Sequence, residues 1–262
     1  MDNNKTVNSL LNVELPPSVD NAINNLSDKP TLVAGRIISD FMDITLGNIS
    51  YLADKVRLKR SYNLEKYRQE LTSSIEKIPP EKLLEPSIQI TAQALEDSKY
   101  CISEKTLRDM FVSLISNSMN EDFSNYVHPS FSGIIKQMSV LDAQIIALFK
   151  NDSLPGLPVC QYCISLPGVA TIPPLPEHIF LEIPEKAITP NSISLESLSR
   201  FGLISISYLE YLHDEKFYEK FAVHPFFTDL QKQMPFGKVS IKKGLVRLTP
   251  LGRSFVAVCI PD

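Results

Sequence analysis

The spacing of apolar residues predicts that most of this chain is helical. After Ser103, apolar side chains recur three and four residues apart, which places them on one face of a helix. They are Leu107, Met110, Phe111, Leu114, Ile115 and Met119. The same period predicts one long or broken helix over residues 31–71, with Gly47-Asn48 as the break. Pro79-Pro80 ends that region, and a second helical stretch begins over residues 83–95.

Two further helices are marked by residues that favour helix starts. Ser139, followed by Asp142, has the spacing of a capping box. His128-Pro129 places a proline at the first turn of a short helix. Residues 127–138 share seven of twelve positions with residues 223–234. We interpret this similarity as chance or as two helices with the same start signal, because the flanking sequences do not match.

The pattern changes near residue 155. Residues 155–190 hold eight of the nineteen prolines, so we expect a loop or a long insertion there rather than a helix. The remaining sequence predicts, in order, a helix over Ser192–Phe201 ended by Gly202, a strand pair over Lys238–Leu248 turning at Lys243-Gly244, and a helix over Leu251–Cys259 capped by Thr249-Pro250.

This order of elements is typical of a winged-helix module. Its landmarks are Arg200-Phe201-Gly202-Leu203-Ile204 after one helix and Leu248-Thr249-Pro250-Leu251-Gly252 before the next. We therefore expect a mainly α fold, with a helical N-terminal bundle and a winged-helix-like α+β unit that contains a small antiparallel hairpin. The expected parts are a flexible arm over 1–30, a helical domain over 31–138, and a winged-helix-like domain over 139–262 with a proline-rich insertion at about 155–190.

Composition places the chain among globular proteins. Of its 262 residues 44% are hydrophobic and 21% charged, and the mean hydropathy is near zero, which excludes a disordered or coiled-coil chain. Four cysteines and the absence of an apolar leader favour a cytoplasmic protein. The uncharged stretch from Ser153 to Pro176 carries six prolines, so we expect a loop there and no membrane helix.

Basic residues gather in two places, although the net charge is −4. The candidates for contact with nucleic acid or a protein partner are Lys238, Lys242, Lys243, Arg247 and Arg253, and, at the end of the first long helix, Lys55, Arg57, Lys59 and Arg60. Residues 230–261 contain no carboxylate, so this end could meet phosphates or an acidic protein face. The helix before Gly202 offers only Arg200 and Glu196 for reading bases, which favours a protein partner. A homo-oligomer is also compatible with the sequence.

Motifs for catalysis are few. Cys160 and Cys163 have the spacing of half a zinc site or of a redox pair, and Cys101, Cys259 and His178 are the residues that could complete a zinc site. None of these repeats a C-x-x-C spacing, so two ordinary cysteines are the favoured interpretation. No phosphate-binding, dinucleotide-binding, nucleophile-elbow or zinc-protease motif is present. We therefore expect no enzyme and no cofactor.

Several segments together resemble a known family. They are Ile78-Pro79-Pro80-Glu81, Leu107-Arg108-Asp109-Met110-Phe111, Asn117-Ser118-Met119, Val127-His128-Pro129-Ser130-Phe131 and Leu141-Asp142-Ala143. They resemble the Abi-alpha (abortive infection alpha) family of bacterial phage-defence-associated proteins, well over residues 30–150 and loosely over residues 248–259. The positions that match the family's pattern are Arg108, Asp109, Asn117, His128, Pro129 and Asp142.

This resemblance implies a cytosolic, mainly helical bacterial protein that takes part in defence, and it supplies no active site. Together with the residue patterns, it leads us to expect a non-enzymatic effector or sensor that acts through protein contacts. The alternative is a winged-helix protein that binds nucleic acid or regulates through it.

Overall fold

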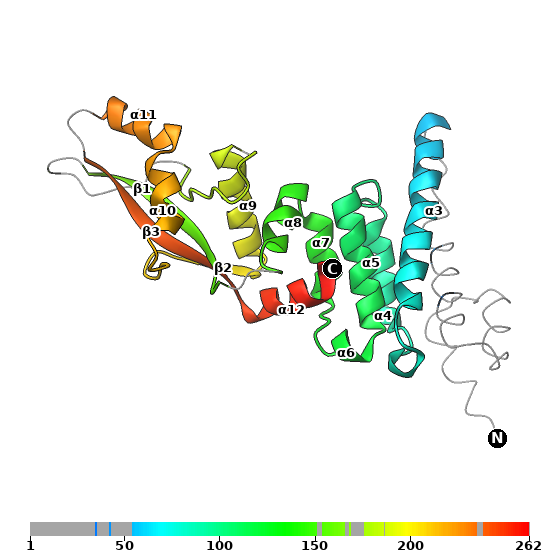
Figure 1. Ribbon diagram of the computed structural model, residues 1–262. Coiled ribbons are helices and arrows are strands. Elements are labelled where there is room, and N and C mark those ends of the chain that lie inside the picture. Colours follow the sequence, from blue (N-terminus) through cyan, green and yellow to red (C-terminus); the bar gives the residue numbers. More distant parts are fainter. Residues whose placement is uncertain are drawn as a thin grey trace, which may run out of the picture.

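The computed structural model describes residues 35, 42, 54–150, 154–165, 168, 176–185, 187–234 and 238–261, and the side chains from residue 61 onward together with those of residues 35 and 42. Within these residues the chain is mostly helical, with one small antiparallel sheet (Figure 1). The helices are α3 (Asp54–Glu76), α4 (Ile88–Ser98), α5 (Lys105–Ser118), α6 (Glu121–Ser124), α7 (Ser130–Gln137), α8 (Val140–Ala147), α9 (Ile188–Arg200), α10 (Lys216–Ala222), α11 (Pro225–Gln233) and α12 (Pro250–Cys259), with a 3-10 turn at Pro80–Lys82. The strands are β1 (Leu157–Ser165), β2 (Ile204–Ser207) and β3 (Lys238–Leu248).

Helix α5 is the centre of the helical part. Its predicted apolar face is confirmed, since all six apolar residues named for it are buried. Helices α3, α4, α6, α7, α8 and α12 all pack against it. Because α12 follows β3 directly, this packing joins the end of the sheet to the bundle, where Asn117 Nδ2 donates to the Val258 carbonyl over 2.8 Å.

The predicted helix starts are confirmed where side chains supply the missing acceptors. Ser139 Oγ accepts from the Asp142 amide at 3.0 Å, and the Asp142 carboxylate accepts from the Ser139 amide at 2.9 Å, which forms the capping box of α8. Thr249 Oγ1 accepts from the Gly252 amide at 2.9 Å and starts α12. Gly202 ends α9 with a φ of 72°, a backbone region that favours glycine.

The sheet corrects the predicted strand pair over Lys238–Leu248. No turn occurs at Lys243-Gly244; these residues lie inside one continuous strand, β3, which is the middle strand in the order β1-β3-β2. Gly244 is present because the chain passes closely there: a Cβ at this position would lie 2.5 Å from a Tyr208 ring carbon and 2.7 Å from the Ser207 carbonyl oxygen. Gly244 is therefore a strand residue that permits close approach, not the predicted turn residue.

The interpretation of the proline-rich region as a loop is also wrong in part, because it contains β1. This strand pairs antiparallel with the whole of β3, from Leu157 opposite Val246 to Ser165 opposite Lys238. The Cys160 amide donates to the Ile179 carbonyl at 3.1 Å, so Cys160 and every second residue from it direct their main-chain groups away from β3. Pro158 is one of them, and its missing N–H therefore costs the sheet no hydrogen bond.

The two faces of the sheet belong to two apolar clusters. One face carries Leu157, Val159 and Val246 into the main core, which continues through α9 and α12 to the helices around α5. The other face packs against α10 and α11, where Tyr162 and Leu245 lie among Tyr218, Phe221, Phe227 and Leu230. Figure 1 shows the sheet at one end of the molecule and α3 at the other.

Several predictions are not tested by the described residues. The arm over 1–30 and the break at Gly47-Asn48 lie outside the described residues. The winged-helix assignment and the domain boundary at residue 139 stay predictions. Among the helices that the structure describes, none combines the length and the apolar character needed to cross a bilayer.

Gly252 tests the junction between the sheet and α12. A Cβ at Gly252 would lie 1.9 Å from the Leu203 carbonyl oxygen. We expect Gly252→Ala to lower the free energy of unfolding by about 2 kcal/mol or more, as overpacking does. Gly133→Ala is the matched control, since nothing lies within 4 Å of that position in α7. It is expected to stabilise by up to about 1 kcal/mol. Urea unfolding measures both, and a neutral Gly252→Ala would contradict the close approach.

Candidate interface on the three-stranded sheet

The structure divides the predicted basic residues of the C-terminal end into those with a carboxylate or carbonyl partner and those without one. Lys238 and Lys242 are exposed. Lys243 forms an ion pair with Glu215, and Arg247 forms one with Glu210 at 2.6 Å. Arg253 Nη1 donates to the Leu248 carbonyl at 3.3 Å. The two exposed lysines are therefore the residues of this set without a carboxylate or carbonyl partner in the described part of the chain.

The carboxylates that pair with β3 come from the segment 208–215, which follows β2. Sequence reasoning missed them, because Lys243 and Glu215 are 28 residues apart and only the fold brings them together. The same segment surrounds Lys243 with aromatic rings: its Nζ lies 5.8 Å from the ring centre of Tyr211 and 5.3 Å from that of Tyr218. Such cation–π contacts hold the lysine in place together with the ion pair.

The segment 208–215 also carries large apolar side chains that the fold leaves uncovered. Leu209 is 91% exposed and Tyr211 is 48% exposed. Leu209 lies beside the end of β2, where its amide donates to Ser207 Oγ at 3.2 Å. We define the sheet-edge surface as Leu209 and Tyr211 of this segment with Lys238 and Lys242 of β3.

A polar cluster lies next to this surface. His178 Nδ1 is 2.8 Å from Tyr208 Oη, and the two rings stack with their centres 6.0 Å apart. Lys242 Nζ lies 5.7 Å from the centre of the Tyr208 ring. Burial lowers the pKa of His178 against the opposing effect of Glu177 and Glu196, and burial also raises the pKa of Tyr208. Both groups are therefore held in their neutral forms.

The second predicted basic group lies on α3. Lys55, Arg57, Lys59 and Arg60 belong to the first two turns of this helix, which continues to Glu76, so they are not at the end of a helix as predicted. Their side chains lie outside the described part of the structure.

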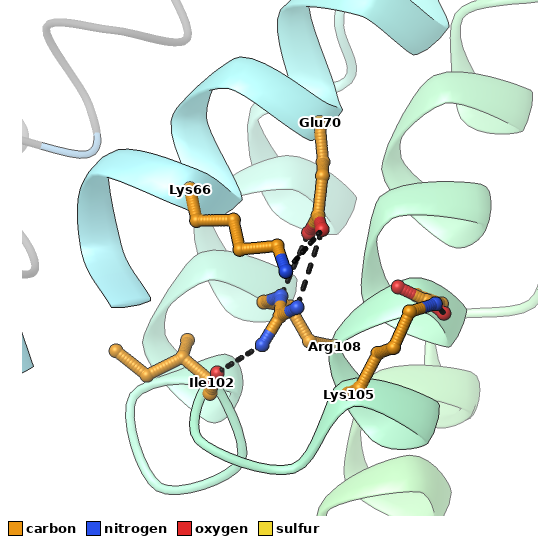
Figure 2. A network of polar contacts seen from close by, with 6 residues as sticks. Lys66, Glu70, Ile102, Lys105 and Arg108 are labelled. Atoms are coloured by element: carbon orange, nitrogen blue, oxygen red, sulfur yellow. Dashed lines mark hydrogen bonds and ion pairs between the residues drawn. The ribbon is translucent and has the colours of Figure 1, made fainter. Parts of the chain in front are cut away.

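Arg108 occupies a structural position between helices (Figure 2). Its guanidinium is 3% exposed. The Nε and Nη2 groups donate to the Glu70 carboxylate of α3 at 2.7 and 3.2 Å, and Nη1 donates to the Ile102 carbonyl at 2.8 Å. The hydrogen bonds to Glu70 raise the pKa of Arg108. This contact ties α3 to α5 and to the loop before α5.

The other positions taken from the family pattern also have local structural partners. Asp109 pairs with Lys105 one turn earlier, Asn117 binds α12, and Asp142 caps α8 and accepts from Ser197 of α9 at 3.3 Å. His128 Nδ1 accepts from the Ser130 amide at 3.2 Å, and Pro129 precedes the first residue of α7.

The repeated sequence at residues 127–138 and 223–234 has the same explanation. His224 Nδ1 accepts from the Phe226 amide, also at 3.2 Å, at the start of α11. The two segments therefore share a histidine that binds an amide in the first turn of a helix.

Cys160 and Cys163 do not face one another. They are three positions apart in β1, so their side chains point to opposite faces of the sheet. Both thiols are buried, and burial raises the pKa of each. Among the described residues no group of three or more metal-ligating side chains surrounds either one.

A pocket of about 300 Å³ lies between α5, α8 and the end of α12. Its charged lining residues include Lys105, Asp109 and Lys150. They are paired within the protein, since Lys105 binds Asp109 and Lys150 Nζ donates to the Ile260 carbonyl at 2.6 Å. The pocket therefore combines one internal ion pair with a lysine whose ammonium group is hydrogen-bonded to the main chain.

Comparison with family models matches residues 59–259 to the family described as abortive infection alpha. The chain belongs to the abortive infection alpha family. The match covers most of the chain and confirms the resemblance seen in the sequence. Searches of curated proteins and of solved structures each gave no match.

Membership of the abortive infection alpha family associates this protein with phage defence. The family match spans α3 through α12 from residue 59, including the proline-rich region that the sequence resemblance did not cover. The family match and the described helices and strands therefore cover nearly the same residues.

Arg108 provides the test of how α3 is held. Arg108→Ala would leave Glu70 without its bidentate partner, and loss of one partner from a buried pair costs about 3 kcal/mol. We expect that loss in the free energy of unfolding, measured by denaturant titration. Lys105→Ala is the control, because that lysine is 71% exposed and its ion pair is worth less than about 1 kcal/mol. Equal effects of the two substitutions would contradict this role of Arg108.

Proposed function

We propose that this protein acts in phage defence as a non-enzymatic effector or sensor, through contact of the sheet-edge surface with another protein. The observation that carries this proposal is the exposure of Leu209 and Tyr211 in the segment that follows β2, on the same small sheet as the exposed Lys238 and Lys242 of β3. Protein interfaces place apolar and aromatic side chains at the centre and charged ones at the rim. A leucine that is 91% exposed adds almost nothing to folding, so its position is well suited to binding.

The pairing of the basic residues favours protein over nucleic acid. Phosphate binding gains affinity from every cation that is free to displace counterions. Lys243 and Arg247 of β3 already bind carboxylates, and Arg253 of α12 donates to a carbonyl. The nucleic-acid alternative is tested by the salt dependence of affinity for duplex DNA. We expect no binding at low salt. Binding to duplex DNA that is lost in Lys242→Glu, Lys243→Glu and Arg247→Glu would establish the nucleic-acid alternative instead.

The placement of the reactive side chains supports a function without catalysis. His128 binds the first turn of α7, and the two cysteines of β1 are buried with raised pKa values. Burial lowers the pKa of His178 and raises the pKa of Tyr208, so both rings are held in their neutral forms. These side chains have roles in packing and in helix starts that account for their presence.

Leu209→Asp tests the proposal. We expect cells that express this variant to lose protection against a phage that the unsubstituted protein restricts, measured as efficiency of plating. The loss should be about tenfold or more, since a central interface residue is worth about 2 kcal/mol. Thermal unfolding of the purified variant should be unchanged, because the leucine side chain makes little contact with the fold.

Ile88→Asp is the matched control for this test. Ile88 is 68% exposed at the start of α4, in the helical bundle rather than on the sheet. It should retain protection. Full protection by a folded Leu209→Asp variant would overturn the proposed function.

A further inference from the structure

Strand β3 has one edge that is only partly paired. Along one side, β1 covers it from Lys238 to Val246. Along the other side, β2 covers only residues 245–248. After β2 the chain turns away from β3 opposite Gly244, where Tyr208 packs against the strand. Residues 238–242 of this edge therefore have no neighbouring strand among the described residues, over a length of about 17 Å at roughly 3.4 Å per residue.

The hydrogen-bonding pattern shows which main-chain groups this edge presents. The Thr249 amide donates to the Leu203 carbonyl at 3.0 Å, so odd-numbered residues of β3 direct their main-chain groups toward β2. The bond from Cys160 to Ile179 gives the same result independently. Because the main-chain groups of Cys160 point away from β3, the odd-numbered residues of β1 bind β3, and these lie opposite the even-numbered residues of β3. Val239 and Ile241 therefore present their N–H and C=O groups at the open edge, and no partner for these groups lies in the described structure.

The side chains along this edge divide by face. Val239 and Ile241 pack partly against the cluster formed with α10 and α11. Lys238 and Lys242 lie on the opposite face and are exposed, with Ser240 between them. A strand added here would meet an apolar cluster on one face and two lysines on the other.

We infer that the open edge of β3 binds an extended segment of a partner protein in which acidic and apolar residues alternate, so that the segment adds a fourth strand to the sheet. This inference rests on the protein-contact function proposed above and names the surface and the partner's chemistry. Main-chain hydrogen bonds to Val239 and Ile241 would supply affinity, as in other cases of strand addition. Carboxylates opposite Lys238 and Lys242, and apolar side chains beside Ile241, would supply selectivity.

The charge of the edge argues against a second copy of this chain as the occupant. Pairing of β3 with β3 would bring Lys238 and Lys242 of both copies onto one face, and β3 contains no carboxylate. Like charges on neighbouring strands are destabilising. Lysine on an exposed edge is a common protection against self-association, and the same lysines favour an acidic strand.

The test is binding of a defined peptide to the full chain. The probe is a fluorescein-labelled peptide in which valine and glutamate alternate over seven residues, followed by fluorescence anisotropy. A peptide with lysine in place of glutamate and a peptide with the valines and glutamates in two blocks are the controls. We expect the alternating acidic peptide to bind at least about tenfold more tightly than either control.

Ile241→Pro removes one N–H from the open edge and leaves every charge in place. We expect it to weaken peptide binding by about tenfold, which corresponds to one or two main-chain hydrogen bonds. The substitution suits an outward-facing position, as Pro158 in β1 shows. Ile241→Val is the matched control, because it keeps the N–H and should bind like the unsubstituted protein.

A charge reversal keeps the test decisive if Ile241→Pro does not fold. Lys238→Glu with Lys242→Glu alters two exposed side chains and should reverse the preference in favour of the lysine peptide. The inference is overturned if folded Ile241→Pro binds the acidic peptide as tightly as Ile241→Val, if the block peptide binds as well as the alternating one, or if duplex DNA binds and the acidic peptide does not.

The peptide assay and the phage assay test the strand-addition inference and the proposed function separately. If Leu209→Asp abolishes protection but the acidic peptide does not bind, the protein-contact function stands and the strand-addition inference is wrong. If folded Leu209→Asp retains full protection, the proposed function itself is wrong, whatever the peptide does.

Discussion

The unequal pairing of β3 is the constraint on which the rest of the sheet depends. One side of the strand is hydrogen-bonded to β1 along nine residue pairs, and the other side is bonded to β2 along four. Its C-terminal half is therefore buried in a three-stranded sheet, and its N-terminal half remains an edge. Because Thr249 caps α12 directly after the strand, and α12 packs against α5, the position of β3 is fixed relative to the helical bundle.

Charge and apolar surface follow from this arrangement. The segment after β2 has to leave the sheet at Gly244, and in doing so it places Glu210 and Glu215 against Arg247 and Lys243. Lys238 and Lys242, nearer the start of β3, form no ion pair with a carboxylate of that segment in the described structure and remain exposed. The uncovered side chain of Leu209 lies on the same segment, and Figure 1 shows the sheet at one end of the molecule.

Sequence patterns predicted those parts of the fold that depend on neighbouring residues. The buried face of α5, the capping box of α8 and the threonine cap of α12 all rest on contacts within a few residues of the chain. The sheet could not be predicted in the same way. A glycine that follows two lysines is compatible with a turn, but pairing with Val159 of the distant strand β1 places Gly244 inside a strand.

The sequence predicts which residues of the candidate interface are basic, but not which of them are paired. The basic residues of β3 could be named, but whether each is free depends on Glu210 and Glu215, and the bond between Arg108 and Glu70 spans 38 residues. Family membership associates the protein with phage defence, whereas the proposed partner follows from the open edge.

Amide hydrogen exchange along β3, followed by NMR, tests the central claim most directly. The account predicts alternation at the start of the strand, with slow exchange at Ser240 and Lys242, which bind β1, and fast exchange at Val239 and Ile241. Farther along, Leu245 and Arg247 should be slow as well, because β2 covers them. Slow exchange at Val239 and Ile241 in the free protein would show that this edge is already occupied and would contradict the account.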